Sequence, residues 1–503
     1  MTNNSFDELL NASGELGFVE TFESPIIHVR GLPSAFPREV VVFENGSTGQ
    51  VLSLDRDSVE VLTLSNDRVR IGSRVTRTQK PLIIPLGKEL LGHTVNPFCQ
   101  SLYGESPVTF QNPEYRDIEK VAGGITSREK VVKSLETGVT VIDLMVPLGK
   151  GQRELIIGDR KTGKTEFVLQ TLLSQSRKGA ICVYACIGKN MSEILKIENF
   201  IRDHGITATS VVVASSAMDP LGSIYSTPYS AMTIAEYFRD LGNEVVLVLD
   251  DLTTHAKYYR EISLIGKRFP GRNSYPGDIF YTHSRLLERA GNFKTERGTF
   301  SISCLALGET LGGDMSGYII TNLMSVTDGH IYFDEEIFTQ GRRPAVNYFL
   351  SVTRVGRQTQ NKLRWDINRE LTTILGLLDK SQVFAHFGAE LSEGIRSTLD
   401  IGNRILDFFN QPMAQVVPLD LQLFIFAAVW SGLLKNVDNR LVMNQLVEDA
   451  VSHYAEDQEF RGFVENMVNL SPDFNAFLGS MRSSVPQVLG FLNVSHGVKQ
   501  EGN

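Results

Sequence analysis

The stretch GQRELIIGDRKTGKTEF, residues 151–167, decides the fold. Within it, residues 158–165 match the Walker A pattern G-x-x-x-x-G-K-[ST], whose backbone N–H groups wrap phosphates. In this pattern the lysine reaches the outer phosphates and the hydroxyl binds magnesium. An apolar run precedes the loop and a helix-like run, TEFVLQTLLSQ, follows it. The stretch predicts a nucleotide-binding loop between a strand and a helix; a glycine-rich turn without a ligand is the alternative.

A strand that ends in two acidic residues lies about eighty residues after the loop. The run EVVLVLDD is an apolar strand that ends in Asp250 and Asp251. A carboxylate in this place can orient magnesium through water, although strands also end in aspartate at simple turns. Because the loop is also present, the functional interpretation of this strand end is favoured. Thr165 is predicted to bind the magnesium ion directly and Asp250 through water. The predicted nucleotide-binding residues are Asp250 and the loop residues Gly158, Asp159, Arg160, Lys161, Thr162, Gly163, Lys164 and Thr165.

Three regions differ in their sequence pattern. A chain of 503 residues exceeds the size of one hydrophobic core, so several domains are expected. Residues 17–85 alternate apolar and polar residues with a turn signal at Asn45-Gly46, which predicts a closed all-β barrel. β-branched runs separated by helical segments predict a mainly parallel α/β domain, and apolar spacings of three and four then predict a helical bundle. We expect domains at residues 1–85, 86–360 and 361–503.

The composition excludes some classes of partner. The net charge of −9 gives no overall attraction to nucleic acid or anionic lipid, so we expect proteins and small anions as partners. Neither a signal peptide nor a transit peptide is expected, and the most apolar stretch, residues 421–434, is too short to span a bilayer. Cys99, Cys182, Cys186 and Cys304 lack metal-ligand spacing and are predicted to be reduced core thiols, which suits a cytosol-like compartment.

Longer blocks carry a family resemblance. They are the loop stretch at residues 151–167, PGRNSYPGDIFYTHSRLLERA at 270–290, TNLMSVTDGHIYFDEEIF at 321–338 and RRPAVNYFLSVTRVG at 342–356. With these blocks the chain resembles the alpha subunit of F-type rotary ATP synthases. The similarity covers nearly the whole chain, from the β-rich region to FAHFGAEL at residues 384–391.

The resemblance implies a subunit with a barrel, a RecA-like P-loop domain and a helical bundle. It implies alternation with catalytic beta-type subunits in a hexameric ring around a gamma-type shaft, with ATP or ADP and Mg²⁺ as ligands. Such a ring couples ATP synthesis or hydrolysis to rotation and to proton or sodium transport, so the chain would be peripheral to an energy-transducing membrane. A peripheral stalk is a further expected partner, although the segment before the barrel is short.

One position argues against catalysis by this chain. Beta relatives have a glutamate after the glycine that ends the strand following the loop's helix, whereas this chain has Gly188-Lys189-Asn190. A lysine cannot act as the carboxylate that activates water. The alpha family usually has glutamine there and at the fifth loop position, close to Lys161. Both lysines either reach phosphates, which would reduce the need for magnesium, or point to solvent, and the sequence leaves both open.

Other roles follow from the resemblance. Arg354 matches the arginine that reaches into a neighbouring beta subunit's site, where a guanidinium stabilises phosphoryl charge; a structural salt bridge is the alternative. Arg343 with Pro344 and Gln411 would contact the adenine. Met413 replaces a second family glutamine there, which weakens polar contact with the base.

Several polar residues have no predicted chemistry, and two other functions stay open. His283 and His386 lack metal-ligand companions and are predicted to pack or to form hydrogen bonds. Glu309 and Asp314 match a family interface loop, with solvated carboxylates as the alternative. One open function is an alpha-type paralogue in a repurposed motor. The other is a self-sufficient hexameric helicase or secretion ATPase, which Lys189 and the acidic balance disfavour.

Overall fold

The computed structural model describes residues 5–65, 69–102, 107–386, 393–437 and 439–492, with side chains 382–396 left out. The chain divides into two compact units. The first contains Met1–Lys130, Gly151–Ile157 and Ser176–Asp328. The second contains Val131–Lys150, Gly158–Gln175 and Gly329–Asn503. No helix among the described residues combines the length and apolar character that a bilayer crossing needs.

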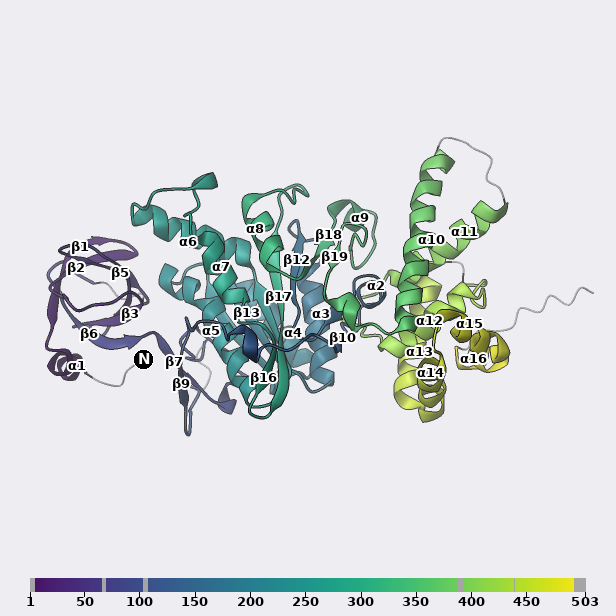
Figure 1. Cartoon of the computed structure of the whole chain (residues 1–503), viewed down its shortest axis with the longest axis horizontal. Helices are drawn as coiled ribbons and strands as arrows, with labels where there is room; N and C mark the ends of the chain where they lie inside the picture. Colours follow the sequence, from purple (N-terminus) through teal and green to yellow (C-terminus); the bar gives the residue numbers. More distant parts are fainter. Residues whose placement is uncertain (1–4, 66–68, 103–106, 387–392, 438, 493–503) are drawn as a thin grey trace, which may run out of the picture. The chain divides into compact units, whose positions relative to one another are not determined.

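The first unit begins with the predicted barrel, drawn in purple in Figure 1. Its six strands close in the order β1-β2-β5-β4-β3-β6. They are β1 (Leu16–Glu23), β2 (Ile26–Arg30), β3 (Glu39–Phe43), β4 (Thr48–Leu54), β5 (Val59–Thr63) and β6 (Arg74–Pro81). Inward side chains such as Val29, Phe43 and Val61 form its core. The Asn45-Gly46 turn joins β3 to β4, and the preceding helix α1 (Phe6–Ser13) carries a capping box from Ser5 and Glu8.

A mainly parallel sheet forms the rest of the first unit, as predicted. Within this unit the strand order is β12-β17-β15-β13-β14-β8, and β16 pairs with β17 antiparallel. The strands are β8 (Thr94–Val95), β12 (Arg153–Gly158), β13 (Ile181–Lys189), β14 (Ser210–Ser216), β15 (Val245–Asp250), β16 (Gly291–Thr295) and β17 (Gly298–Glu309). The central strands are buried on both faces, which explains their continuous β-branched runs. All four cysteines are buried and free, which confirms them as core thiols.

Helices cover this sheet. They are α4 (Met191–Asp203), α5 (Leu221–Asp240), α6 (Leu252–Ile265), α7 (Ile279–Leu287) and α8 (Tyr318–Val326). The longest, α5, packs against β13, β14 and β15 and is buried along most of its length. A two-stranded antiparallel sheet of β7 (Ile83–Leu86) and β9 (Glu114–Asp117) lies outside the main sheet, and its β7 contacts α5.

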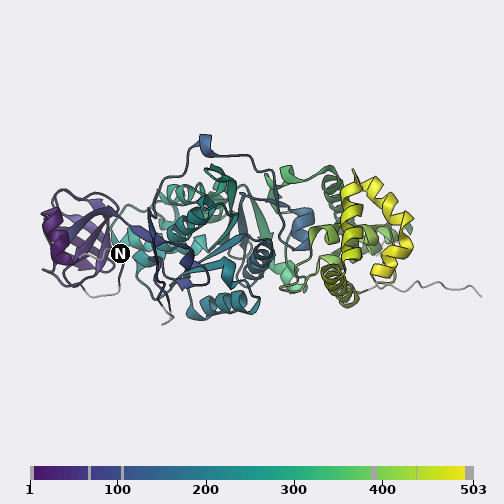
Figure 2. The same cartoon turned by 90° about the horizontal axis from the view of Figure 1, so that it is seen from below.

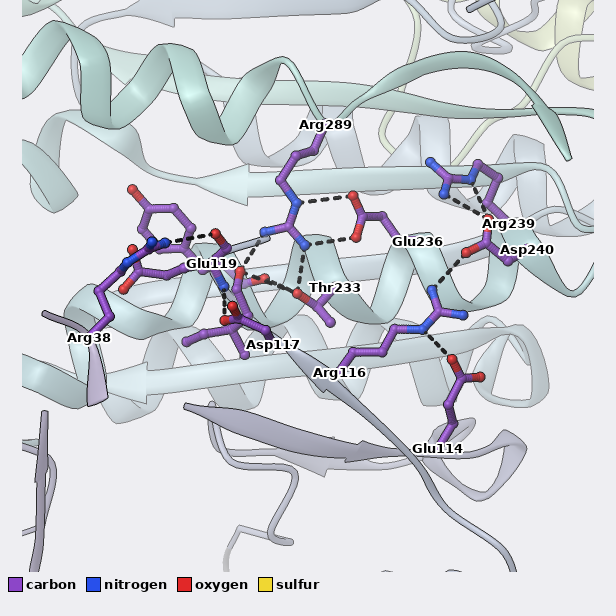
Figure 3. A network of polar contacts seen from close by, with 12 residues as sticks. Arg38, Glu114, Arg116, Asp117, Glu119, Thr233, Glu236, Arg239, Asp240 and Arg289 are labelled. Atoms are coloured by element: carbon purple, nitrogen blue, oxygen red, sulfur yellow. Dashed lines mark hydrogen bonds and ion pairs between the residues drawn. The ribbon is translucent and has the colours of Figure 1, made fainter. Parts of the chain in front are cut away.

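A buried ion pair joins Arg289, just after α7, to Glu236 on α5 (Figure 3). Arg289 donates to both carboxylate oxygens of Glu236, at 3.0 and 2.8 Å, and to Thr233 Oγ1 at 2.7 Å. Its remaining guanidinium nitrogen donates to the Ile118 carbonyl. The Arg289 side chain is only 1% exposed, so its planar fork is fully used inside the protein.

The second unit is mostly helical. Its helices are α2 (Thr140–Met145), α3 (Lys164–Arg177), α9 (Glu335–Thr339), α10 (Lys362–His386), α11 (Glu393–Phe409), α12 (Leu419–Trp430), α13 (Arg440–Glu456), α14 (Gln458–Leu470), α15 (Phe474–Ser483) and α16 (Val485–Phe491). Two short strand pairs accompany them: β10 (Ser134–Leu135) with β11 (Leu148–Gly149), and β18 (Gly329–Phe333) with β19 (Val352–Thr353). The C-terminal helices, yellow in Figure 2, pack together, and α12 is apolar because its neighbours bury it nearly all round.

Candidate nucleotide site

The loop at residues 158–165 follows β12 and leads into α3, as the motif predicts. Gly158 has φ 152°, and a Cβ there would lie 2.4 Å from the Phe333 carbonyl oxygen. Gly163 has φ 99°. Both glycines are therefore needed for the path of the backbone. Below the loop, the rings of Phe167 and Phe333 lie 5.8 Å apart and support it.

The loop side chains differ in where they point. Lys164 Nζ donates to the carbonyls of Gly158 and Asp159 at 2.7 and 2.5 Å, and buried Thr162 donates to the Asp159 carbonyl at 2.8 Å. Thr165 is half-buried on the first turn of α3, whereas Arg160 and Lys161 are exposed. Lys161 adopts φ 62°, a left-handed conformation that costs a residue with a Cβ on the order of 1 kcal/mol.

The residues predicted at the adenine also lie in the second unit. The Arg343 backbone N–H donates to Asn410 Oδ1 at 2.7 Å, and its guanidinium lies 3.5 Å above the Phe338 ring. Gln411 donates to the Gly138 carbonyl at 2.7 Å and accepts from the Thr140 N–H at 2.9 Å. Because its amide is hydrogen-bonded to these backbone groups, Gln411 stabilises the start of α2.

The other two residues of this region are more accessible. Pro344 is half-buried beside Arg343, and Met413 is 50% exposed. An exposed thioether offers only weak acceptance of a hydrogen bond, so any polar contact with a base must come from elsewhere.

Arg354 is held at the surface of the second unit by a well-packed turn. The preceding Thr353 donates to the Pro147 carbonyl at 2.8 Å, and a Cβ at Gly356 would lie 1.8 Å from the same oxygen. Arg354 itself is exposed, and across the described parts of the chain no hydrogen bond or ion pair reaches its guanidinium. The structural salt bridge is therefore not seen there.

In the first unit, the ammonium group of Lys189 lies against Asp250 at the end of β15. Strands β13 and β15 run parallel with Cys186 opposite Asp250, which brings the end of β13 to the end of β15. Lys189 Nζ lies 2.6 Å from Asp250 Oδ1 and 3.4 Å from Asp251 Oδ2. The hydroxyl of Tyr184 donates to Asp250 Oδ2 at 2.8 Å. Both carboxylate oxygens of Asp250, the residue predicted to orient magnesium, therefore already have a partner in Lys189 or Tyr184.

Burial and charge act in opposite directions on this pair. Burial disfavours the charged form of Lys189, but the carboxylates of Asp250 and Asp251 outweigh it and raise the pKa of Lys189. Burial raises the pKa of Asp250, whereas the contacts with Lys189 and Tyr184 favour its charged form. We regard it as ionised at neutral pH, because an ammonium at 2.6 Å and a donated hydrogen bond both favour the carboxylate.

Asp250 does not fit a magnesium ion in this arrangement. Magnesium is usually bound through carboxylates and keeps several waters in a strict octahedron. Here the carboxylate is 4% exposed and already has an ammonium against it. The neighbouring Asp251 caps α6 by accepting from the Thr254 N–H at 2.6 Å, so it is not free to replace Asp250.

The remaining predicted polar residues make contacts within the chain. His283 is buried, 3.2 Å from the ring of His255, which confirms the packing prediction; burial lowers the pKa of both imidazoles. Glu309 pairs with Lys257 at 3.3 Å, and Asp314 accepts from the Ser316 N–H at 2.8 Å within its own turn. The side chain of His386 and most of the segment 384–391 lie outside the described residues.

Sequence reasoning missed Tyr184. It is the aromatic residue in the apolar run ICVYACIG, and it is 1% exposed. Because side chains alternate along a strand, Tyr184 shares a face with Cys186, whose partner in the sheet is Asp250. The available signal was that Tyr184 stands two residues before Cys186, the residue that pairs with Asp250 at the end of its strand.

Two family models match the chain. Residues 138–353 match the ATP synthase alpha/beta family, nucleotide-binding domain. Residues 360–473 match the ATP synthase alpha/beta chain, C terminal domain. The first match includes the loop, Lys189, Asp250 and Arg343, the second includes Gln411, and Arg354 lies between them.

Individual relatives match over most of their length. ATP synthase subunit alpha of Clostridium acetobutylicum is 40% identical over 82% of this chain and 82% of its own. The subunit alpha of Caldanaerobacter subterraneus subsp. tengcongensis is 39% identical over 84% of each chain. That of Neorickettsia sennetsu is 38% identical over 85% of each chain.

Proposed function

The chain belongs to the ATP synthase alpha/beta family and groups with its alpha subunits, and from this premise we propose that it binds nucleotide without hydrolysing it. Lys189 carries the proposal. It stands where catalytic relatives have a glutamate, and its ammonium is bound to Asp250 at 2.6 Å. A side chain that is cationic and already paired cannot accept a proton from water.

The bound ligand in this proposal is ATP or ADP. The loop at residues 158–165 has the glycine geometry that lets backbone N–H groups approach phosphates. Lys164, which now donates to loop carbonyls, has three donors and can exchange these bonds for phosphate oxygens. Of the predicted base contacts, Arg343 and Pro344 are half-buried, whereas the amide of Gln411 is bonded to the backbone at Gly138 and Thr140.

Arg354 supplies the catalytic contribution, in the site of a neighbouring beta-type subunit. An exposed guanidinium with no partner among the described residues has unsatisfied donors to offer to another chain. An arginine supplied in trans stabilises the charge on a transferring phosphoryl group. The packed turn at Thr353 and Gly356 fixes the backbone from which it projects.

The proposed assembly is a ring in which this chain alternates with beta-type subunits around a gamma-type shaft. The ring would act on ATP synthesis or hydrolysis coupled to rotation and ion transport, peripheral to a membrane and attached through the assembled complex and a stalk. Purification of the native complex through a tag on this chain tests the assembly. Recovery of beta-type, shaft and membrane subunits supports it, and recovery of a ring without ion-transporting subunits would indicate a repurposed motor.

Replacement of Arg354 tests its proposed role. In the assembled ring, Arg354→Lys should lower steady-state ATP hydrolysis by about 10³- to 10⁵-fold, because a lysine cannot reproduce the planar fork. Nucleotide binding to this chain should not change. Arg369→Lys, at a side chain that is 70% exposed, is the matched control and should retain full hydrolysis. Full hydrolysis by the Arg354→Lys ring would refute the assignment.

A further inference from the structure

The outer face of the barrel carries a cluster of three metal-ligating side chains, His28, Asp55 and Glu60. His28 on β2 lies directly opposite Glu60 on β5, and the residues on either side of each belong to the barrel core. Because side chains alternate along a strand, His28 and Glu60 both point outward. Asp55 joins them from the turn after β4, where its N–H donates to the Ser58 carbonyl at 2.9 Å. One ligand atom from each of the three side chains lies within 4.8 Å of the other two.

The two carboxylates of this cluster have no lysine or arginine to neutralise them. Glu60 is only 9% exposed, and it accepts a hydrogen bond from the hydroxyl of Ser53, its partner on β4. Over the parts of the chain that the structure describes, no lysine or arginine forms an ion pair with Glu60 or Asp55. Buried charges in proteins are paired or coordinate metals. A protonated His28 and a bound metal ion are the two ways to supply the positive charge.

The types of ligand select the metal. Magnesium and calcium are bound by oxygen ligands alone, whereas an imidazole with carboxylates suits zinc. In a tetrahedral zinc site with bonds of about 2.0–2.2 Å, neighbouring ligand atoms are about 3.5 Å apart. Because the three ligand atoms are already within 4.8 Å, small side-chain rotations close the site. The hydroxyl of Ser53 orients Glu60 in the way that an outer-shell partner orients a ligand.

We propose that His28, Asp55 and Glu60 form a zinc site on the outer face of the barrel, with water as the fourth ligand. A bound zinc ion joins β2 and β5 to the turn between β4 and β5, and it stabilises the folded barrel by mass action. All three ligands belong to the barrel and none to the loop at residues 158–165. The inference therefore goes beyond the proposed function, and either can fail without the other.

Titration calorimetry with zinc on the full-length chain, stripped of metal and without nucleotide, tests the inference. The wild-type chain should bind a single zinc ion with a dissociation constant in the micromolar range or below. Since loss of an outer-shell partner costs about 10- to 100-fold in metal affinity, Ser53→Ala should weaken binding about tenfold. His28→Gln and Asp55→Asn remove a ligand and should weaken it by about 100-fold or more.

Asp57→Asn is the matched control for Asp55→Asn. It removes the same charge from an exposed side chain of the same turn, outside the cluster, and should bind zinc like the wild type. Equal losses in Asp57→Asn and Asp55→Asn would show that general charge attracts the ion, which overturns the inference.

X-ray absorption by the zinc complex of the wild-type chain gives a readout that needs no variant. The spectrum should show an imidazole among nitrogen and oxygen ligands at about 2.0–2.2 Å, and no sulfur at about 2.3 Å. Absence of zinc binding, zinc without an imidazole, or an affinity unchanged in His28→Gln overturns the inference. Absence of zinc binding together with lower stability of His28→Gln would identify a protonated imidazole as the cation instead. Each of these results leaves the proposed nucleotide binding untouched.

Discussion

Two buried ion pairs of the first unit have the same charges and different designs. Arg289 and Glu236 meet through two parallel hydrogen bonds, and the guanidinium also donates to Thr233 and to the Ile118 carbonyl. Lys189 and Asp250 meet through one ammonium, which also approaches Asp251. The arginine is 1% exposed and the lysine 17%.

The difference separates a structural tie from a candidate site. A planar fork whose three nitrogens all donate within the protein fixes geometry, and at 1% exposure it is closed to a ligand. An ammonium on a flexible stem can keep its carboxylate and still turn a donor towards an anion. Exposure distinguishes the two cations, 1% for Arg289 and 17% for Lys189, and so does the rigid two-bond geometry of the guanidinium.

Breaking the arginine pair should have the larger effect on stability. Glu236→Gln leaves the buried Arg289 guanidinium without its charge partner and should lower the free energy of unfolding by about 3–5 kcal/mol. Denaturant unfolding, followed by fluorescence, measures this loss. Glu114→Gln, at a carboxylate that is 52% exposed and paired with Arg116, should cost about 0–1 kcal/mol. A similar small loss for both variants would show that the Arg289 pair does not hold the unit together.

Breaking the lysine pair should cost less. In Lys189→Gln, the Tyr184 hydroxyl still donates to Asp250 and the new amide can donate to the other oxygen. We expect a loss of about 1–3 kcal/mol in the same unfolding experiment, because the buried carboxylate loses its cation but keeps these hydrogen bonds. A loss as large as that of Glu236→Gln would identify Lys189 as a structural tie and weaken the contrast between the two pairs.

Much of the fold was accessible from the sequence. Alternation in residues 17–85 predicts the barrel, and the β-branched runs predict a buried parallel sheet, because each pattern reflects how many faces of a strand are covered. Helical spacing after residue 361 predicts the C-terminal helices. The division into domains at residues 85 and 360 stays a prediction.

The site was less accessible, because pairing across strands determines it. The motif places residues 158–165 and marks Asp250, but the contact between Lys189 and Asp250 depends on the register of β13 against β15. The roles of Tyr184 and Gln411 depend on which backbone and side-chain groups lie within reach in the folded chain. Lys161 is exposed, and its contact with phosphates stays a prediction.

The most direct test of nucleotide binding without hydrolysis is the fate of ATP on the purified full-length chain. Radiolabelled ATP should bind, stay bound during gel filtration and be recovered as ATP, because no carboxylate at residue 189 activates water. Recovery of ADP with continuous release of phosphate from the chain alone would contradict a non-catalytic role. That result would instead support a self-sufficient P-loop motor.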